Sequence, residues 1–263
     1  MWSVEGSTNC RVPTASLAKF AAKHDADEKK QKMTIFPQEG RGQAMRRGVK
    51  GVAFDMDGLL LNTEDLYQLV GMELMKKRGK EYREDVRRKM IGLPAPKAFG
   101  VLIEEERLDD TWEQLQRETD DLFEQILEAK LELMKGVEEV VAMVEAKGLP
   151  RCVATSSTRS FARKALNQKK LLARMNFLIT AEDVPRGKPH PDIYEEAAKK
   201  MGIQAEEMLV LEDSEHGTAA GVAAKAIVVS VPNEHTKHGR FDGAAMIADT
   251  LLDVRLKELL DRS

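Results

Sequence analysis

The sequence lacks several features that define specialised classes of protein. Only two of its 263 residues are cysteines, Cys10 and Cys152, and they lie far apart without the spacing of a metal site. This usage fits a reducing compartment, so we expect a cytoplasmic protein without a disulfide framework. No apolar run approaches the roughly 20 residues that a membrane span needs. The extreme N-terminus also lacks the apolar segment of a secretory signal.

A strong charge of either sign is missing as well. The formal net charge is −3, with 32% charged and 42% hydrophobic residues. No basic field favours nucleic acid, so we expect neither nucleic-acid nor membrane partners, and a monomer or weak homodimer. The length allows one large α/β domain or a core with an inserted cap.

Residues 1–49 differ in composition from the rest of the chain. They mix Ser, Thr, Gly and Pro with charged residues, which favours a disordered tail. Two alternatives remain open. Translation could begin at Met33 or Met45, or the segment could be a transit peptide, although its acidic residues at 25–28 argue against this.

The most informative stretch runs from Gly51 to Glu64 and reads GVAFDMDGLLLNTE. It begins as an apolar, β-prone segment, continues into Asp55 and Asp57, and breaks at Gly58. Carboxylates at the end of a buried strand are costly unless a cation or a protonation role stabilises them. The stretch therefore predicts a reactive site at the end of the first strand.

The next part of the chain is helical in pattern. Apolar residues recur at helical spacing, and strand signals are absent. We predict an all-helical insert over residues 65–135. Its helices are expected from Thr63 to a stop at Gly79, over Glu84–Met90, over Pro96–Glu106 and within Thr111–Met134.

After Lys135 strands and helices alternate, which predicts βαβ units, a parallel sheet and an α/β fold class. The core should comprise residues 50–64 and 136–263. In such sheets, functional sites lie at the carboxyl ends of the strands. Strands are expected near 50–55, 151–155, 177–180, 208–211, 226–231 and 244–248, and helices near 136–147, 161–167, 193–201, 214–223 and 251–260.

Two strand ends carry carboxylates. Asp55 and Asp57 follow the first strand, and Glu212 and Asp213 follow the strand that reads MLVL. Converging carboxylates repel one another, and a hard divalent cation with oxygen ligands relieves that repulsion. The pattern predicts a Mg²⁺ site.

Other strand ends and loops supply donors for an anion. Thr155 and Ser156 lie at the end of the strand that reads RCVAT, and Lys188 lies in the loop before a later helix. A cation, an ammonium and N–H donors around one point describe a phosphoryl site. A carboxylate can then attack the phosphoryl group, and a second carboxyl can transfer the protons.

Four motifs together resemble the haloacid dehalogenase-like hydrolase superfamily, in the helical-cap branch that includes sugar-phosphate phosphatases and β-phosphoglucomutase. Their order and spacing make the resemblance specific, and it covers Val52 to Val231. The resemblance implies a Rossmann-like core with an inserted helical cap. The motifs are DMDG (Asp55–Gly58), ATSS (Ala154–Ser157), GKPHPD (Gly187–Asp192) and LEDSEHG (Leu211–Gly217).

The resemblance implies a role for each matched residue. Asp55 matches the nucleophile and Asp57 the general acid and base. Thr155 matches the hydroxyl that binds the phosphoryl group, helped by the Ser156 backbone. Lys188 matches the lysine that steadies the nucleophile and the phosphate.

The resemblance also implies the Mg²⁺ ligands. Asp55 and Asp213 match carboxylate ligands, and Glu212 matches an acidic position that binds the metal directly or through water. Asp57 would contribute its backbone carbonyl. Asn62 stands where the family usually has an aspartate, and the sequence does not predict the effect of this departure.

Other members of the superfamily are alternatives. A dehalogenase lacks the second aspartate, whereas Asp57 is present. A phosphonatase needs a cap lysine, for which Lys76 and Lys77 remain open. The serious alternative is a phosphomutase, which carries a histidine ten residues after the second aspartate. Tyr67 stands at that position here.

The mutase also carries a cap loop that reads Lys-Gly-x-x-Arg. The matching residues 91–95 keep Gly92 but lack both basic residues, so the clamp for a second phosphate is missing. We therefore expect a phosphatase that acts on a small phosphorylated metabolite, with Gly92 and Lys97 as candidate substrate contacts. A non-catalytic binding module is the alternative of another class.

Two further expectations concern residues near these motifs. Ser157 is expected to cap the following helix rather than to contact substrate. The histidines do not have zinc-site spacing, so we expect surface or loop roles for them. They include His190, His216, His235 and His238.

Overall fold

The computed structural model describes residues 48–90 and 95–261. The predicted N-terminal tail up to residue 47 lies outside the described residues, and so does Gly92. The predictions made for them stay predictions.

A parallel sheet of six strands forms the centre of the fold, in the order β3-β2-β1-β4-β5-β6. The longer strands are buried along their whole length and read as nearly continuous apolar runs, as expected where helices cover both faces. The expected α/β fold is confirmed. The strands are β1 (Gly51–Phe54), β2 (Arg151–Ala154), β3 (Phe177–Ile179), β4 (Met208–Glu212), β5 (Ile227–Ser230) and β6 (Met246–Ile247).

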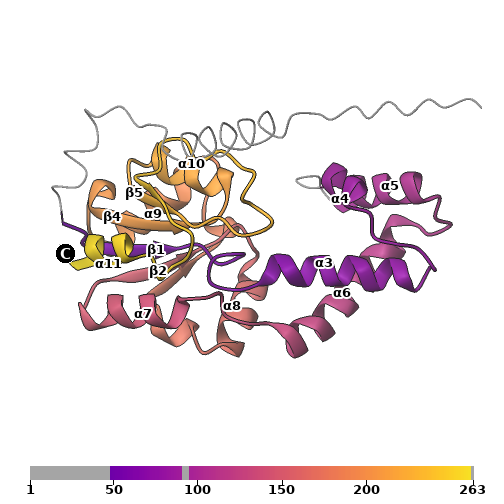
Figure 1. The fold of residues 1–263 in the computed structure, drawn as a ribbon, viewed down its shortest axis with the longest axis horizontal. Helices are drawn as coiled ribbons and strands as arrows, with labels where there is room; N and C mark the ends of the chain where they lie inside the picture. The colour runs from indigo at the N-terminus through magenta and orange to yellow at the C-terminus, as the bar shows by residue number, and fades with distance from the viewer. Residues whose placement is uncertain (1–47, 91–94, 262–263) are drawn as a thin grey trace, which may run out of the picture. The chain divides into compact units, whose positions relative to one another are not determined.

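Helices cover both faces of this sheet (Figure 1). Helices α9 and α10 lie on one face and contact β1, β2, β4 and β5, while α7 and α8 lie on the other. The bounds are α7 (Val137–Ala146), α8 (Arg159–Gln168), α9 (Asp192–Met201), α10 (Glu215–Ala223) and α11 (Val254–Asp261).

The C-terminal helix begins later than the sequence pattern predicts. The expected start is Leu251, but α11 begins at Val254. Asp253 explains the difference, because its carboxylate accepts a hydrogen bond from the backbone N–H of Arg255 at 2.9 Å and thereby caps the helix.

The segment between β1 and α7 is helical, as expected. Helices α3 and α6 pack against each other, and the insert has its own apolar cluster that includes Leu74, Val86 and Leu115. Trp112, which the pattern placed on the apolar stripe, is instead exposed at the first residue of α6. The helices are α3 (Thr63–Lys76), α4 (Glu84–Met90), α5 (Ala95–Glu106) and α6 (Trp112–Lys130).

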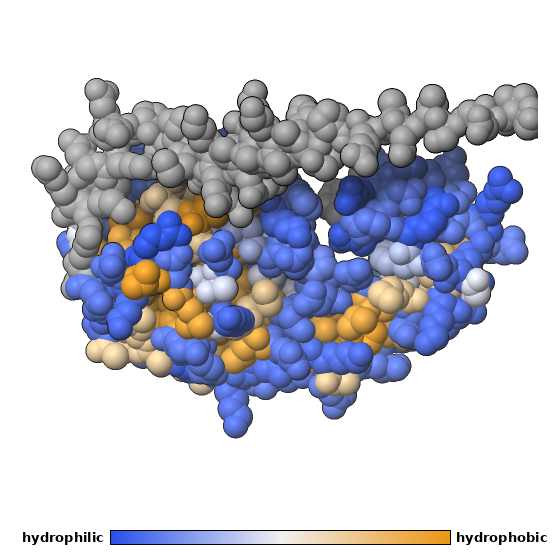
Figure 2. All heavy atoms as spheres, in the orientation of Figure 1, coloured by the Kyte–Doolittle hydropathy of each residue, from blue (hydrophilic) through white to orange (hydrophobic). Residues whose placement is uncertain are grey.

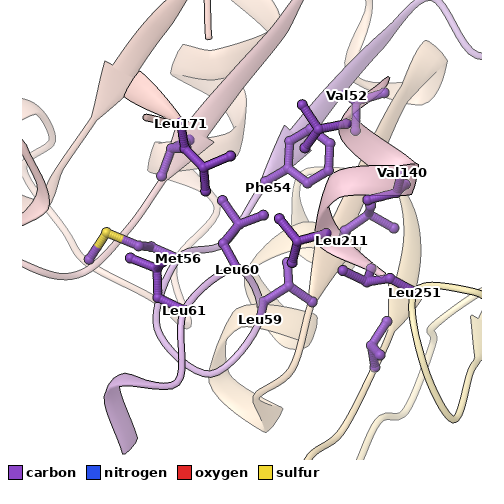
Figure 3. Packing of buried hydrophobic residues seen from close by; sticks show 14 of the residues in the cluster. Val52, Phe54, Met56, Leu59, Leu60, Leu61, Val140, Leu171, Leu211 and Leu251 are labelled. Carbon is purple, nitrogen blue, oxygen red and sulfur yellow. The ribbon is translucent and has the colours of Figure 1, made fainter. Parts of the chain in front are cut away.

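The chain that leaves β1 for the insert is anchored in the main core. Phe54 and Met56 are fully buried, and so are Leu60 and Leu61 after the turn at Gly58. Figure 3 shows these side chains packed with residues from β4, α7 and the segment that precedes α11. Because side chains alternate along an extended chain, Asp55 and Asp57 point away from this apolar face.

Among the residues that the structure describes, no helix is both long and apolar enough to cross a membrane. The face drawn in Figure 2 is mostly hydrophilic, with hydrophobic patches between the polar residues.

Candidate active site

The site lies where the strand order changes direction. Strands β2, β1 and β4 are neighbours, and Phe54 is in register with Val153 on one side and Leu211 on the other. The residues that follow these strands therefore meet at one edge of the sheet. The backbone N–H of Asp55 donates to the carbonyl of Leu211 at 2.9 Å, so the hydrogen bonding between β1 and β4 continues as far as Asp55.

The ammonium of Lys188 is the electrostatic centre of the site. It donates to Asp55 Oδ1 at 2.5 Å, Glu212 Oε1 at 2.6 Å and the carbonyl of Ala154 at 3.0 Å. Its three donors are thus all used. Burial alone would lower the pKa of Lys188, but the carboxylates of Asp55 and Glu212 raise it well above its ordinary value. Lys188 is therefore a fixed cation.

Glu212 is fully buried and accepts hydrogen bonds on both oxygens. Besides Lys188, Oε1 accepts from the Tyr194 hydroxyl at 2.8 Å. Oε2 accepts from the Asp213 N–H at 3.0 Å, the Ser214 N–H at 3.1 Å and the Ser214 hydroxyl at 3.0 Å. These donors stabilise a buried charge at the start of α10.

A glycine makes this arrangement possible. A Cβ at Gly217 would lie 1.7 Å from Glu212 Oε1, so no other residue leaves room for that carboxylate. This accounts for the glycine that closes the LEDSEHG motif, on the first turn of α10.

The carboxylates carry more negative charge than Lys188 balances. Burial raises the pKa of Asp55, and Lys188 opposes that rise, whereas Glu212 and Asp213 add to it. Burial and then the charge of Glu212 raise the pKa of Asp213 to about 8. Asp55, Glu212 and Asp213 each offer an oxygen within 4.8 Å of the others. A set of hard oxygen donors this close together fits a divalent cation such as Mg²⁺.

Asp57 faces a different set of partners. Its Oδ1 accepts from the hydroxyl of Thr63 at 2.8 Å, and its Oδ2 accepts from Thr155 at 2.9 Å and Ser157 at 2.7 Å. Thr63 is the first residue of α3. Asp57 therefore connects the start of the helical insert to the loop after β2.

This geometry corrects the expectation for Ser157. The residue that caps α8 is Thr158, whose hydroxyl accepts from the N–H of Phe161 at 3.4 Å. Ser157 stands one position earlier and directs its hydroxyl to Asp57 instead. Thr158 therefore caps the helix, whereas its neighbour Ser157 binds Asp57.

Comparison with known proteins identifies the family. Residues 52–231, more than half of the chain, match the model of the family described as "Haloacid dehalogenase-like hydrolase". The chain belongs to the haloacid dehalogenase-like hydrolase family. The resemblance of the four motifs is therefore confirmed, and so is the expectation of a hydrolase.

Curated relatives in the haloacid dehalogenase-like family are named phosphatases. The chain is 31% identical to "Probable pseudouridine-5'-phosphatase" of Drosophila melanogaster, over 80% of this chain and 93% of that protein. It is 30% identical to "(DL)-glycerol-3-phosphatase 2" of Arabidopsis thaliana, over 82% of this chain and 92% of that protein.

Solved structures from the haloacid dehalogenase-like family share the fold. A hydrolase of Deinococcus radiodurans, crystallised with phosphate and sodium, has a TM-score of 0.68 at 24% identity, covering 81% of this chain and 97% of that one. A β-phosphoglucomutase of Clostridium difficile has a TM-score of 0.61 at 17% identity, covering 81% and 97%. At these identities the likeness concerns the fold alone.

Most of the expected residues of the family motifs meet at the site. Asp55, Asp57, Thr155, Lys188 and the pair Glu212–Asp213 are linked by the contacts above. Ser156 is exposed, and Lys97 is exposed on α5. His190, His216 and His238 are also exposed, while His235 lies in a loop and contacts Asp65 on α3 at 2.7 Å.

Tyr67 lies near the site on α3. Its ring stacks on Phe123 with centroids 4.5 Å apart, and Phe123 in turn contacts Phe161 of α8 at 5.5 Å. Partial burial and then the charges of Asp57 and Glu64 raise the pKa of the Tyr67 phenol, although 47% of the residue is exposed.

Several residues of the site were not anticipated from the sequence of this family member. Tyr194 and Thr63 lie on helices, and nothing in the sequence pattern around them indicates that they belong to a site. Asn233 could have been found, because it follows the carboxyl end of β5 at the same edge of the sheet. Its side chain donates to Asp213 at 2.8 Å.

Proposed function

We propose that this protein is a Mg²⁺-dependent phosphatase that hydrolyses a small phosphorylated metabolite, such as a sugar phosphate or a similar phosphomonoester, through an aspartyl phosphate. The observation that carries the proposal is the buried ammonium of Lys188, held between Asp55 and Glu212 at 2.5 and 2.6 Å. A fixed cation beside a carboxylate suits a site that accepts a phosphoryl group.

In the first step, an oxygen of Asp55 attacks phosphorus. The bond from phosphorus to the leaving oxygen breaks, and that oxygen keeps the electron pair and takes a proton from Asp57. In the second step, water attacks the aspartyl phosphate while Asp57 accepts its proton. The bond from phosphorus to Asp55 then breaks, and inorganic phosphate leaves.

The hydroxyl of Thr155 would bind a phosphoryl oxygen, with the Ser156 backbone N–H as a further donor. Lys188 would stabilise the phosphoryl group by its positive charge beside Asp55, since its three donors are already used. In the structure, the Thr155 hydroxyl donates to Asp57. Phosphate binding would therefore exchange this contact for one with substrate. Lys97 and Gly92 remain candidates for contacts with the leaving group.

Asp55 and Asp213 would hold Mg²⁺ directly, and the backbone carbonyl of Asp57 would complete their side of the shell. Glu212 already accepts five hydrogen bonds, which favours contact through water. When bound, Mg²⁺ supplies positive charge for the phosphoryl oxygens.

A β-phosphoglucomutase-type phosphomutase is the alternative within the family. Tyr67 stands where that enzyme has a histidine, and its neutral, stacked ring supplies no cation for a second phosphate. This favours hydrolysis. The names of the curated relatives favour small phosphomonoesters, of which pseudouridine 5'-phosphate and glycerol 3-phosphate are two classes to test.

The remaining proposals rest on the sequence. Residues 65–135 would act as a cap on a Rossmann-like core of residues 50–64 and 136–263. A reducing, cytoplasmic setting fits the cysteine usage, and the charge balance favours small metabolites over nucleic acid or membranes. We propose a monomer or weak homodimer.

The test is phosphate release from a panel of phosphomonoesters, with Mg²⁺ and with EDTA. We expect turnover of at least one small metabolite with Mg²⁺ only, and none by Asp55→Asn. Conversion of β-glucose 1-phosphate to the 6-phosphate without phosphate release would favour the mutase. A folded protein without turnover on any substrate, including an aryl phosphate, would favour the binding module.

A further inference from the structure

The loop after β5 returns to the active site at Asn233. The side-chain amide of Asn233 donates to Asp213 Oδ2 at 2.8 Å and to the backbone carbonyl of Gly58 at 3.0 Å. Resting on the proposed phosphatase function, we propose that Asn233 is a positioning residue that holds the Asp213 carboxylate in the orientation that binds the cation.

The orientation of the Asn233 amide is determined by its surroundings. Its Oδ1 accepts from the backbone N–H groups of His235 at 2.8 Å and Thr236 at 3.2 Å. Both lone pairs of the oxygen and both hydrogens of the nitrogen are therefore used. A flipped amide would place its oxygen against the oxygens of Asp213 and Gly58, so the donor side must face the site.

The turn that carries Asn233 is itself held in place. The backbone N–H of Asn233 donates to the Thr236 hydroxyl at 3.0 Å. At its other side, His235 Nε2 contacts Asp65 Oδ1 in the first turn of α3 at 2.7 Å. The turn is therefore closed by an internal hydrogen bond and linked to α3 through His235, while the four hydrogen bonds of the amide itself set its orientation.

The contact determines which oxygen of Asp213 is available. Asn233 occupies Oδ2, which leaves Oδ1 for a metal ion. An amide does this without adding charge to a site that already holds several carboxylates. By contrast, an aspartate would repel Asp213, and a lysine would neutralise it.

Gly58 shows how closely these groups pack. It adopts a positive φ of 79°, and a Cβ on it would lie 2.6 Å from both Asn233 Nδ2 and Asp213 Oδ2. Because Gly58 of the DMDG motif has no Cβ, the amide of Asn233 can approach Asp213. Outer groups that orient a ligand typically change metal affinity 10- to 100-fold when removed.

The experiment measures Mg²⁺ binding by isothermal titration calorimetry in wild-type protein and in Asn233→Ala, Thr236→Val and Glu234→Ala. We expect Asn233→Ala to weaken Mg²⁺ binding by about 10- to 100-fold. Thr236→Val loosens the turn but keeps the amide, and Glu234→Ala alters an exposed neighbour. The Mg²⁺ affinity of both variants should stay within about 3-fold of wild type, well below the loss expected for Asn233→Ala.

Kinetics give a second readout. In Asn233→Ala, the Mg²⁺ concentration for half-maximal rate should rise by a similar factor, while kcat at saturating Mg²⁺ changes little. Thermal unfolding in EDTA shows whether the variant is folded. Wild-type Mg²⁺ affinity in a folded Asn233→Ala variant would overturn the proposal, and so would an equal loss in Thr236→Val.

The outcomes separate this proposal from the proposed function. If the wild-type protein binds Mg²⁺ but hydrolyses no phosphomonoester, the phosphatase proposal fails and the comparison of affinities still decides the role of Asn233. If the wild-type protein binds no Mg²⁺, both proposals fail. If it hydrolyses substrate and Asn233→Ala binds Mg²⁺ normally, only the proposal for Asn233 fails.

Discussion

At the scale of single residues, Asp55 and Asp57 differ in what surrounds them. Asp55 is buried beside Lys188 and two other carboxylates, in surroundings that suit a nucleophile next to a cation. Asp57 is less buried and accepts hydrogen bonds from three hydroxyl groups within the described part of the chain. Two aspartates separated by one residue thus lie in different chemical surroundings, as the two roles proposed for them require.

The first prediction tests this division with an aryl phosphate whose leaving group needs no proton. In Asp57→Asn, Asp55 should still take the phosphoryl group, but the second step loses its base. Stopped-flow measurement should show one burst of the phenolate, followed by turnover reduced about 10²- to 10⁴-fold. Asp55→Asn should show no burst. Full steady-state turnover in Asp57→Asn would contradict the assignment.

At the scale of elements, the site depends on how closely β4 and α10 approach each other. Glu212 ends β4 and Gly217 lies on the first turn of α10, with no room for a Cβ between them. Ser214 caps α10 and also donates to Glu212. The end of β4 and the start of α10 are therefore linked by hydrogen bonds and packed without space between them.

The second prediction compares two glycines inside helices. Gly217→Ala should destabilise the protein by at least about 2 kcal/mol, because the new methyl group displaces the Glu212 carboxylate. A methyl group in Gly100→Ala on α5 meets no atom of the other described residues within 4 Å, so the change should be neutral or stabilising by up to about 1 kcal/mol. Urea unfolding of both variants measures the difference, and equal effects would rule out the steric explanation.

The helical insert has its own electrostatic link. Arg78, just after α3, donates to Asp110 at 2.7 and 2.9 Å and to Glu118 of α6 at 2.7 Å. Its side chain is mostly buried, with 16% exposed. The hydrogen bonds from Arg78 hold the pKa of Asp110 below its ordinary value of 3.8.

The third prediction follows from the sign of that shift. A lowered carboxyl pKa contributes stability above the ordinary pKa and loses it as the pH falls through the lowered one. Arg78→Met should therefore cost about 1–2 kcal/mol at pH 7. The difference from wild type should shrink below about pH 4.

The control for this prediction is Arg88→Met, which removes an exposed pair with Glu84. It should cost less than about 0.5 kcal/mol at either pH. Thermal or urea unfolding of each variant and of wild type at pH 7 and pH 3 gives the four differences in stability. A difference between Arg78→Met and wild type that is independent of pH would mean that packing of the arginine stem, not its charge, stabilises the insert.

At the scale of the whole molecule, the described fold starts immediately before β1. Val49 is 2% exposed and belongs to the main apolar cluster. Composition alone predicts a tail over residues 1–49, but Val49 belongs to the core, so the predicted tail is too long at its C-terminal end. If the residues before Gly48 are a tail, the fold needs none of them.

The fourth prediction tests that expectation by truncation. A chain that begins at Gly48, after an initiator methionine, should keep kcat/KM and Tm close to those of the full chain. A chain that begins at Lys50 also loses Val49 and should unfold at a lower temperature, because burial of a valine is worth about 1.5–3 kcal/mol. A large loss of Tm or activity in the first truncation would show that the tail has a structural or catalytic role.

Much of this molecule follows from local patterns. Apolar runs that end in polar residues predict buried parallel strands, and helical spacing predicts the insert, because both depend on neighbours in the chain. The rule that sites lie at the carboxyl ends of parallel strands also predicts that Asp55, Thr155 and Asp213 lie close together. Element ends were less certain, as the late start of α11 at Val254 shows.

Residue type and order are thus enough to predict the α/β class, the family and the candidate residues of the site. Which of these groups share a hydrogen bond follows from the folded arrangement alone. It assigned Ser157 to Asp57, surrounded Glu212 with five donors, and brought Asn233 to Asp213 across the strand edge. These contacts depend on side-chain direction between segments far apart in the chain, and no local pattern carries that information.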